Sequence, residues 1–220
     1  MSPSQLTRVG VIGDVHCQDR TLQRAIAFFE EEAMDRILCV GDIVDGPGGD
    51  VDRCCTLLRE HRVATVRGNH ERWLLRGELR NLPDATLDVA ASSRIFLEGL
   101  PVTLEFQTPQ GTMMLCHGIG EDDMVVVTGD TRGYGLQHAL AEVRHREELR
   151  YLVCGHTHQR MVRTLGTLTL LNAGTLHPGY NPCVMSVDFE RGVATHHDID
   201  ESGVRKGVPV RFDARVSLIG

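Results

Sequence analysis

The sequence contains no run of about 18 or more uncharged apolar residues, the length that a membrane-spanning helix needs. Residues Met1 to Arg8 also lack the positively charged start and the apolar stretch of a secretory signal. Internal repeats, low-complexity tracts and proline-rich linkers are missing as well. We therefore expect a cytoplasmic protein without membrane contacts. We also expect a single domain over residues 1–220, with its functional motifs in about 8–190 and a C-terminal extension at 201–220.

Regularly spaced cysteines and an excess of positive charge are also missing. The seven cysteines form no CxxC pair, and Cys39, Cys116 and Cys154 each lie in an apolar, strand-like run, so we expect buried, reduced thiols. The formal net charge of −7 argues against long nucleic acids as partners, because binding them depends on neutralising phosphates with Lys and Arg. A small, compact substrate is the better expectation, and formation of a homo-oligomer is left open.

Histidine, in contrast, is abundant. The chain has eleven histidines, and several stand beside Asp, Asn or Gly where a predicted strand ends. Imidazole binds metal ions and exchanges protons near neutral pH, so this pattern indicates metal or proton chemistry. With 41% hydrophobic residues, the chain can bury a sizeable core to support such a site.

The first third of the chain alternates between predicted strands and helices. Short apolar runs predict strands at 8–12, 36–40 and 63–66, and apolar residues at helical spacing predict helices at 22–33 and 51–61. Such a βαβαβ order indicates a parallel sheet with right-handed crossovers.

The second half is richer in strands. One helix is predicted at 136–149, and Val208, Val210 and Phe212 alternate in the manner of an edge strand. The other predicted strands are at 102–106, 112–116, 151–154, 161–165, 168–171, 184–189 and 193–197.

Polar clusters follow five of these strands. A single cluster of this kind is ordinarily a helix cap or a turn, but ligands of open α/β sheets bind at the carboxyl ends of strands, where the five would converge. Their donors are oxygen and nitrogen without thiolate, which suits Mn²⁺, Fe²⁺ or Zn²⁺ better than Ca²⁺ or Mg²⁺ alone. The clusters are Asp14-Val15-His16, Gly41-Asp42, Gly68-Asn69-His70-Glu71, Cys116-His117-Gly118 and Gly155-His156-Thr157-His158.

In this order the clusters resemble the calcineurin-like metallophosphoesterase superfamily, whose pattern runs D-x-H, GD-x-x-D, GNH-E/D, H and GH-x-H. The resemblance covers about residues 8–190 and is strongest to small bacterial phosphodiesterase-type members. It implies an α/β fold, a four-layer α/β/β/α sandwich in which two mixed β-sheets are flanked by helices. It also places the metal site at one end of the sandwich.

The resemblance further implies a centre of two divalent metal ions, with Mn²⁺ first and Fe, Zn or Ni as alternatives. Asp42 would bridge the ions, and a hydroxide shared between them would attack phosphorus. His70 would be the second catalytic residue and would protonate the leaving group; the alternative is a histidine that caps a helix. Asp45 would not contact a metal ion directly; it would orient the ligands or shape their loop. The terminal ligands would be Asp14, His16 and His158 for one ion, and Asn69, His117 and His156 for the other.

Substrate contacts are expected from Asn69, Arg72, Thr175 and His177, although residues 172–176 also fit a plain turn. Protein Ser/Thr phosphatases and dinucleoside tetraphosphate hydrolases of the superfamily carry an Arg where this chain has Gly46. That missing Arg and the acidic residues 121–123 favour phosphodiesters or small phosphomonoesters over highly charged substrates. Replacements for the Arg would come from Arg67, Arg72, Arg132, Arg160 or Arg163.

Three alternatives remain at the level of sequence. The retromer scaffold subunit keeps this fold for protein binding and has lost catalytic residues, so a catalytically silent scaffold is one. A hydrolase of phosphoproteins or dinucleoside polyphosphates is the second. The third is a zinc- or iron-dependent hydrolase or oxidase that acts on a substrate without phosphate.

Overall fold

Two β-sheets form the centre of the structure, a computed structural model that describes residues 5–212. The first sheet has the order β11-β10-β9-β1-β2-β3, and β12 pairs with β10. Strands β1, β2 and β3 are parallel, and β9 runs antiparallel to β1, so this sheet is mixed. Its strands are β1 (Arg8–Ile12), β2 (Arg36–Cys39), β3 (Ala64–Thr65), β9 (Cys183–Asp188), β10 (Val193–Asp200), β11 (Gly203–Arg205) and β12 (Val210–Arg211).

The second sheet has the order β4-β5-β6-β8-β7 and is also mixed. Strands β5, β6 and β8 are parallel, whereas β4 and β7 run antiparallel to their neighbours at the two edges. Its strands are β4 (Leu104–Thr108), β5 (Gly111–Leu115), β6 (Leu149–Cys154), β7 (Arg160–Leu165) and β8 (Leu168–Ala173).

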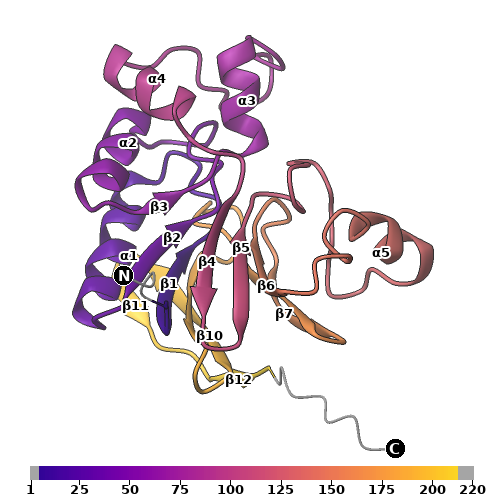
Figure 1. Ribbon diagram of the computed structural model, residues 1–220. Helices are drawn as coiled ribbons and strands as arrows, with labels where there is room; N and C mark the ends of the chain where they lie inside the picture. The colour runs from indigo at the N-terminus through magenta and orange to yellow at the C-terminus, as the bar shows by residue number, and fades with distance from the viewer. Residues whose placement is uncertain (1–4, 213–220) are drawn as a thin grey trace, which may run out of the picture.

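Helices lie on the outer side of each sheet (Figure 1). On α1, Leu22, Ala25, Ile26 and Phe29 are buried at helical spacing, so one face of the helix packs onto the first sheet. No helix within residues 5–212 is long and apolar enough to cross a membrane. The helices are α1 (Asp19–Glu31), α2 (Val51–Glu60), α3 (Asn69–Arg76), α4 (Ala91–Glu98) and α5 (Gly133–Ala139).

Buried apolar residues form three clusters, one in each gap between layers. The middle cluster joins the facing sides of the two sheets, with Val9 and Val11 of β1 on one side and Tyr151 and Val153 of β6 on the other. A second cluster lies between the first sheet and α1, α2 and α4. The third lies outside the second sheet, under α5 and the segments on either side of it. The predicted four-layer α/β/β/α sandwich is therefore confirmed.

The parallel βαβαβ start is confirmed, and β12 confirms a short strand near the end of the chain, although Val208 and Phe212 lie outside it. The helix predicted at 136–149 is confirmed for residues 136–139 and is wrong beyond Ala139. Helix α5 begins at Gly133 and ends at Ala139, and Leu149 is already the first residue of β6, paired with Thr112. The chain turns between α5 and β6. The apolar residues in this segment have helical spacing because they pack into the third cluster, outside the second sheet. Helices α3 and α4 were not predicted. The last part of the expected extension, residues 213–220, lies outside the described residues.

Candidate metal centre

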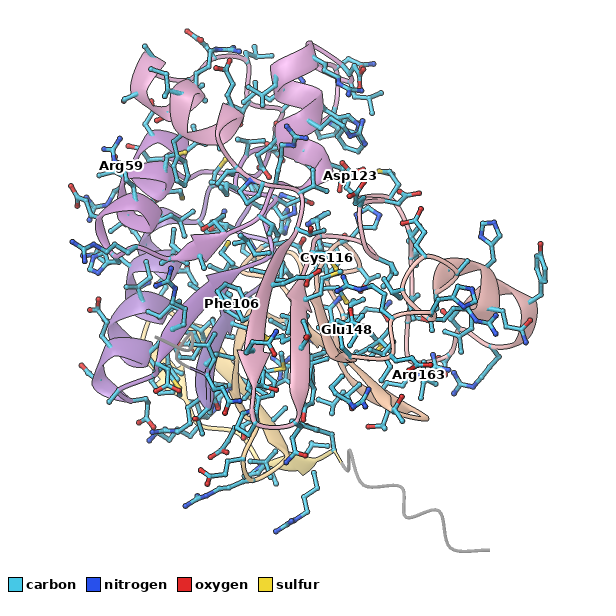
Figure 2. All side chains as sticks on the ribbon, in the orientation of Figure 1. Arg59, Phe106, Cys116, Asp123, Glu148 and Arg163 are labelled. Atoms are coloured by element: carbon cyan, nitrogen blue, oxygen red, sulfur yellow. The ribbon has the colours of Figure 1, made fainter. Side chains whose placement is uncertain are left out.

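The predicted donors follow strands of both sheets and come together at one end of the sandwich. Asp14 follows β1 and Asp42 follows β2, whereas His117 and His156 follow β5 and β6 of the other sheet. The two sheets touch at this end through a parallel bridge between Asp14 and Thr175. Figure 2 shows Cys116, the residue before His117, where β5 ends near the middle of the molecule.

Two groups of possible ligand atoms share one carboxylate. Ligand atoms of His16, Asp42 and His158 all lie within 4.8 Å of one another, and those of Asp42, His117 and His156 do the same. Asp42 belongs to both groups and is 1% exposed. This is the arrangement that a carboxylate bridging two cations requires.

Asn69 contacts two members of the second group. Its Oδ1 is 2.8 Å from His117 Nε2 and 2.9 Å from His156 Nδ1. His117 Nε2 is also 3.1 Å from a carboxylate oxygen of Asp42. Two oxygen atoms therefore face one ring nitrogen, an arrangement that a bound cation would stabilise.

Hydrogen bonds behind the ligands orient their rings. His117 Nδ1 donates to the Val40 carbonyl at 2.7 Å, which leaves Nε2 to face the centre. His16 Nδ1 lies 2.5 Å from the Asp45 carbonyl, and its Nε2 lies 3.0 Å from His158 Nε2. Metal-binding histidines are typically oriented in this way, by a hydrogen bond from the nitrogen that does not bind the metal.

Asp14 provides a test of whether a cation fits. Its Oδ1 accepts a hydrogen bond from the His156 backbone at 2.9 Å, but its Oδ2 is buried without a partner. A buried carboxylate oxygen left unpaired is costly, and burial raises the pKa of Asp14 to about 7. A bound cation would remove that cost. The donor set and the unpaired oxygen both fit a divalent metal ion.

The ionisation of the other groups agrees with this fit. Burial by itself would raise the pKa of Asp42, but the charge of His117 and a hydrogen bond from it outweigh burial, and the pKa falls below its usual range. For His117, burial is outweighed by the charge of Asp42, and its pKa rises to about 10, so the site favours positive charge at this ring. Burial lowers the pKa of His16, and it lowers that of His158 to about 3, which keeps both rings in the neutral, metal-binding form.

The loops that carry the donors adopt a backbone conformation that is uncommon outside glycine. Left-handed φ angles at non-glycine residues cost free energy and persist where the surroundings enforce them, often at functional sites. Four donor residues have such angles: His16 (47°), Asp42 (46°), His156 (65°) and His158 (57°).

Glu71, at the end of the Gly68-Asn69-His70-Glu71 motif, holds the Asp42 loop in place. Its carboxylate accepts hydrogen bonds from the backbone N–H groups of Asp42 at 2.9 Å, of Ile43 at 2.6 Å and of Gly68 at 2.8 Å. A Cβ at Gly68 would stand 2.2 Å from Asp42 Oδ1, so this position requires glycine. The third motif therefore supports the second one as well as supplying a donor.

His70 is held beside the centre by a chain of polar contacts. Its Nδ1 lies 2.8 Å from Asp45 Oδ2, and its Nε2 lies 3.9 Å from Asp42 Oδ2. Arg80 donates to both carboxylate oxygens of Asp45, at 2.8 and 2.9 Å, and the Thr86 backbone N–H donates to Oδ1 at 2.8 Å. Sequence reasoning missed Arg80 and Thr86, because they lie on an irregular segment with no recognisable motif.

The same contacts shift the pKa values of Asp45 and His70. Burial would raise the pKa of Asp45, but hydrogen bonds from His70 and Arg80 lower it to about 2. Burial would likewise lower the pKa of His70, yet the hydrogen bond to Asp45 and the charge of Asp42 raise it above its usual value. His70 therefore holds a proton more readily than a free histidine.

The residues expected to contact substrate have varied surroundings. Arg72 makes two hydrogen bonds to Asp123, at 2.7 and 2.8 Å (Figure 2 labels Asp123 on its loop beside α3). The Thr175 hydroxyl is buried and donates to the Asp14 carbonyl at 2.7 Å. The ring of His177 lies 5.4 Å from that of His16, next to the centre.

Three of the other four arginines considered as replacements donate hydrogen bonds from their side chains to protein acceptors. Arg160 pairs with Asp198 at 2.6 Å. Arg163 donates to the carbonyls of Thr128 and Thr131, at 2.8 and 2.7 Å. Arg132 donates to the Gly129 carbonyl at 2.5 Å. For Arg67, the contact that the structure gives is between its backbone N–H and the Pro101 carbonyl, at 2.8 Å.

The fold and the site define a class of protein. The calcineurin-like phosphoesterase superfamily domain matches residues 7–192, so the chain belongs to this superfamily. Serine/threonine-protein phosphatase 1 of Salmonella typhimurium is 30% identical over 125 residues, which cover 50% of this chain and 57% of that protein. The chain therefore matches little more than half the length of this curated relative.

Solved structures of two other proteins share the fold. The phosphoesterase YfcE from E. coli has a TM-score of 0.59 at 17% identity, over 94% of this chain and 100% of that one. Vacuolar Protein Sorting 29 from Cryptosporidium parvum has a TM-score of 0.58 at 18% identity, over 95% of this chain and 100% of that one. At these identities the likeness concerns the fold alone.

Proposed function

We propose that the protein hydrolyses phosphate esters with two divalent metal ions, which its own side chains would hold. The observation that carries the proposal is the position of Asp42, whose carboxylate belongs to both groups of ligand atoms. His16 and His158 complete one group, and His117 and His156 complete the other. Asp14, with its unpaired oxygen, and Asn69 add one oxygen donor each.

When bound, the two cations would activate a water molecule and neutralise the oxygens of the phosphate. The protein holds them with imidazole, carboxylate and amide donors, which supports Mn²⁺ as the preferred ion, with Fe, Zn or Ni as alternatives. The strained loops and the hydrogen bonds behind the ligands fix the donors before substrate arrives, so little reorganisation is required.

His70 is proposed to act as the general acid. Its Nδ1 contacts Asp45, and its Nε2 faces the centre near Asp42. The raised pKa of His70 keeps a proton available near neutral pH, and this proton would pass to the oxygen of the departing group. Asp45 and Arg80 position the ring, and they have no direct part in the reaction.

The proposed substrate is a phosphodiester or a small phosphomonoester, and diesters are expected to be preferred. A phosphomonoester dianion needs more cationic donors than a diester monoanion. Arg72, the arginine nearest in sequence to His70, is already paired with Asp123, and Arg160 and Arg163 are paired elsewhere. The charge left for a dianion would then come mainly from the metal ions.

Two alternatives keep specific support. The similarity to serine/threonine-protein phosphatase 1 favours a phosphoprotein as substrate, but it covers only about half of each chain. The protein-binding scaffold is the second alternative, and the fold shared with Vacuolar Protein Sorting 29 is compatible with it. A scaffold has no need for the strained donors, the unpaired Asp14 oxygen or a proton held on His70, and these features therefore support catalysis.

The test is a comparison of protein stripped of metal with protein reloaded with Mn²⁺. We expect hydrolysis of bis-p-nitrophenyl phosphate to disappear with EDTA and to return with about two ions per chain, counted by metal analysis. Full activity in protein without metal would contradict the mechanism. A kcat/KM at least about tenfold higher on p-nitrophenyl phosphate would contradict the preference for diesters and leave the mechanism standing.

A further inference from the structure

A cavity of about 560 Å³ opens beside the metal centre. His158, one of the candidate ligands, forms part of its wall, and residues Pro178 to Asn181 form another part. This volume falls within the range of pockets that bind small molecules. A substrate whose phosphorus lies at the metal centre could therefore place one of its substituents in this cavity.

Aromatic rings form the wall between the cavity and the centre. The ring of Tyr180 stands edge-on to His158, with centroids 4.6 Å apart, and edge-on to His177 at 5.3 Å. The ring of His177 in turn lies 5.4 Å from that of His16. Tyr180 is 54% exposed, so part of its ring remains open to a partner.

The loop that carries Tyr180 is held by its own hydrogen bonds. The Tyr180 backbone N–H donates to the His177 carbonyl at 3.1 Å, and that of Gly179 donates to His177 Nδ1 at 2.9 Å. The His177 backbone N–H donates to Thr175 Oγ1 at 3.0 Å. The ring of Tyr180 is thus supported by the same loop that contacts Asp14, which limits the entropy lost when a ligand binds.

The charges at the cavity are paired. Arg160 donates to Asp198 at 2.6 Å and to the Asn181 carbonyl at 3.4 Å, and Arg205 also reaches Asp198, at 3.0 Å. A charged substituent would have to displace these partners. An uncharged planar ring could stack on Tyr180 without doing so.

We propose that this cavity binds an uncharged planar aromatic group on the substrate, and that Tyr180 is the residue that recognises it. The inference rests on the proposed function, because the metal centre must bind the phosphate next to it. It narrows the substrate to phosphate esters that carry an aryl group or a nucleobase. These two sources share the same stacking chemistry and differ in the distance between phosphorus and ring.

The test measures binding by calorimetry with Mn²⁺-loaded protein, so no turnover is needed. Phenylphosphonate is compared with methylphosphonate, and adenosine 5′-monophosphate with ribose 5-phosphate, since the members of each pair present similar anions. Stacking of one ring predicts about tenfold tighter binding for the aromatic member of one pair. A preference in the first pair indicates an aryl group close to phosphorus, and a preference in the second indicates a nucleobase.

Three variants assign the preference to the ring. Tyr180→Ala should abolish it without loss of bound metal, and Tyr180→Phe should retain it. Tyr134→Ala is the matched control, because Tyr134 is also an exposed tyrosine, at 80%, but lies on α5 away from the centre. Equal binding of both members in both pairs, or a preference that survives Tyr180→Ala, would overturn the inference. Failure of all four ligands to bind would overturn the proposed function together with it.

Discussion

Asp42 contributes to the candidate metal centre through both its side chain and its backbone. Its side chain is shared by both groups of ligand atoms, and its carbonyl accepts hydrogen bonds from the backbones of Val15 at 2.9 Å and His16 at 2.7 Å. Its own backbone N–H is held by Glu71. The Asp42 Oδ1 also accepts a hydrogen bond from the His70 backbone at 3.0 Å, and asparagine keeps this oxygen, so Asp42→Asn changes the charge while the hydrogen bonds of the loop can remain.

Asp42→Asn should reduce bound metal more than the loss of any terminal ligand does. The amide keeps the shape of the side chain but removes the charge that balances two cations. We expect less than one ion per chain in Asp42→Asn, against about one in His158→Ala, with turnover lowered by at least about a thousandfold in Asp42→Asn. Metal analysis and initial rates measure both effects. Near-normal metal content and activity in Asp42→Asn would show that this residue does not bridge two ions.

His70→Ala should leave the metal ions bound and lower turnover by roughly a hundredfold for esters with poor leaving groups. Nitrophenyl esters should lose less, because their leaving group departs without a proton. Arg80→Ala serves as a comparison, since it would loosen Asp45 and the His70 ring but keep the acid itself, and a smaller loss is expected. Equal losses for nitrophenyl and alkyl esters would assign His70 to the positioning of metal or substrate.

At the scale of elements, the contact between α3 and the loop after His117 bears on substrate choice. Arg72 of α3 and Asp123 of this loop are largely buried, with side chains 21% and 15% exposed, so their pairing is stronger than that of a surface salt bridge. The acidic residues 121–123, which the sequence suggested would repel anions, are thus partly neutralised. The same contact also occupies the guanidinium of Arg72, which could otherwise bind a phosphate.

Asp123→Asn should release Arg72 and shift the preference toward phosphomonoesters. We expect the ratio of kcat/KM for p-nitrophenyl phosphate to that for bis-p-nitrophenyl phosphate to rise about fivefold to tenfold, as expected for one freed charge-assisted contact. In the double variant Arg72→Gln with Asp123→Asn, the ratio should return to its original value. An unchanged ratio in the single variant would mean that Arg72 cannot reach the phosphate.

Residues that follow strands could be predicted from the sequence, whereas residues on irregular segments could not. Donors that directly follow buried strands, such as Asp14 and Asp42, could be found because strand ends converge by geometry. Arg80 could not, because its contact with Asp45 depends on the path of an irregular segment that no local pattern defines. Beyond Ala139, the helix expected at 136–149 failed for a similar reason: tertiary packing of Leu140 and Val143 produced helical spacing in a chain that turns.

At the scale of the whole molecule, the proposed metal centre lies where the two sheets meet. Each group of ligand atoms takes members from both sheets: Asp42 follows β2 of the first, and His117, His156 and His158 follow β5 and β6 of the second. Bound cations would thus connect the two halves of the sandwich. Their removal should weaken the contact between the sheets as well as abolish activity.

Mn²⁺ at about a hundred times its dissociation constant should raise the free energy of unfolding by about 2.7 kcal/mol for each ion bound. For a protein of this size, that corresponds to an increase in melting temperature of about 5 to 10 °C, measurable by calorimetry. Asp42→Asn is the control and should show a much smaller increase. An equal increase in both proteins would place the stabilising ions somewhere other than the proposed centre.

Acid should destabilise the protein partly through His197 on β10. The residue is 5% exposed, its ring contacts Ser186 Oγ at 2.8 Å, and burial lowers its pKa to about 4 from an ordinary value near 6.5. Between these values the unfolded chain binds the proton and the folded chain does not, so stability is full above pH 6.5 and falls as the pH drops toward 4. The loss from this group is on the order of 2 to 3 kcal/mol.

His197→Gln should flatten this part of the stability curve, because glutamine can keep a hydrogen bond to Ser186 but does not titrate. Denaturant unfolding at a series of pH values measures the difference from the unaltered protein. His138→Gln, at an exposed position on α5, is the matched control and should leave the curve unchanged. Curves of the same slope for His197→Gln and the unaltered protein would contradict the assignment.

The hydrogen bonds of Glu71 affect how active and inactive members of the superfamily can be told apart. Gly68 and Glu71 shape the loop that carries Asp42, and a chain that had given up catalysis would still need them to keep its backbone in place. In the Gly68-Asn69-His70-Glu71 signature, the presence of Gly68 and Glu71 therefore indicates a conserved loop structure and does not indicate catalytic activity. The more informative position is His70, whose ring makes its polar contacts with the side chains of Asp42 and Asp45, and a relative that lacks it is expected to be inert however well the rest of its signature is preserved.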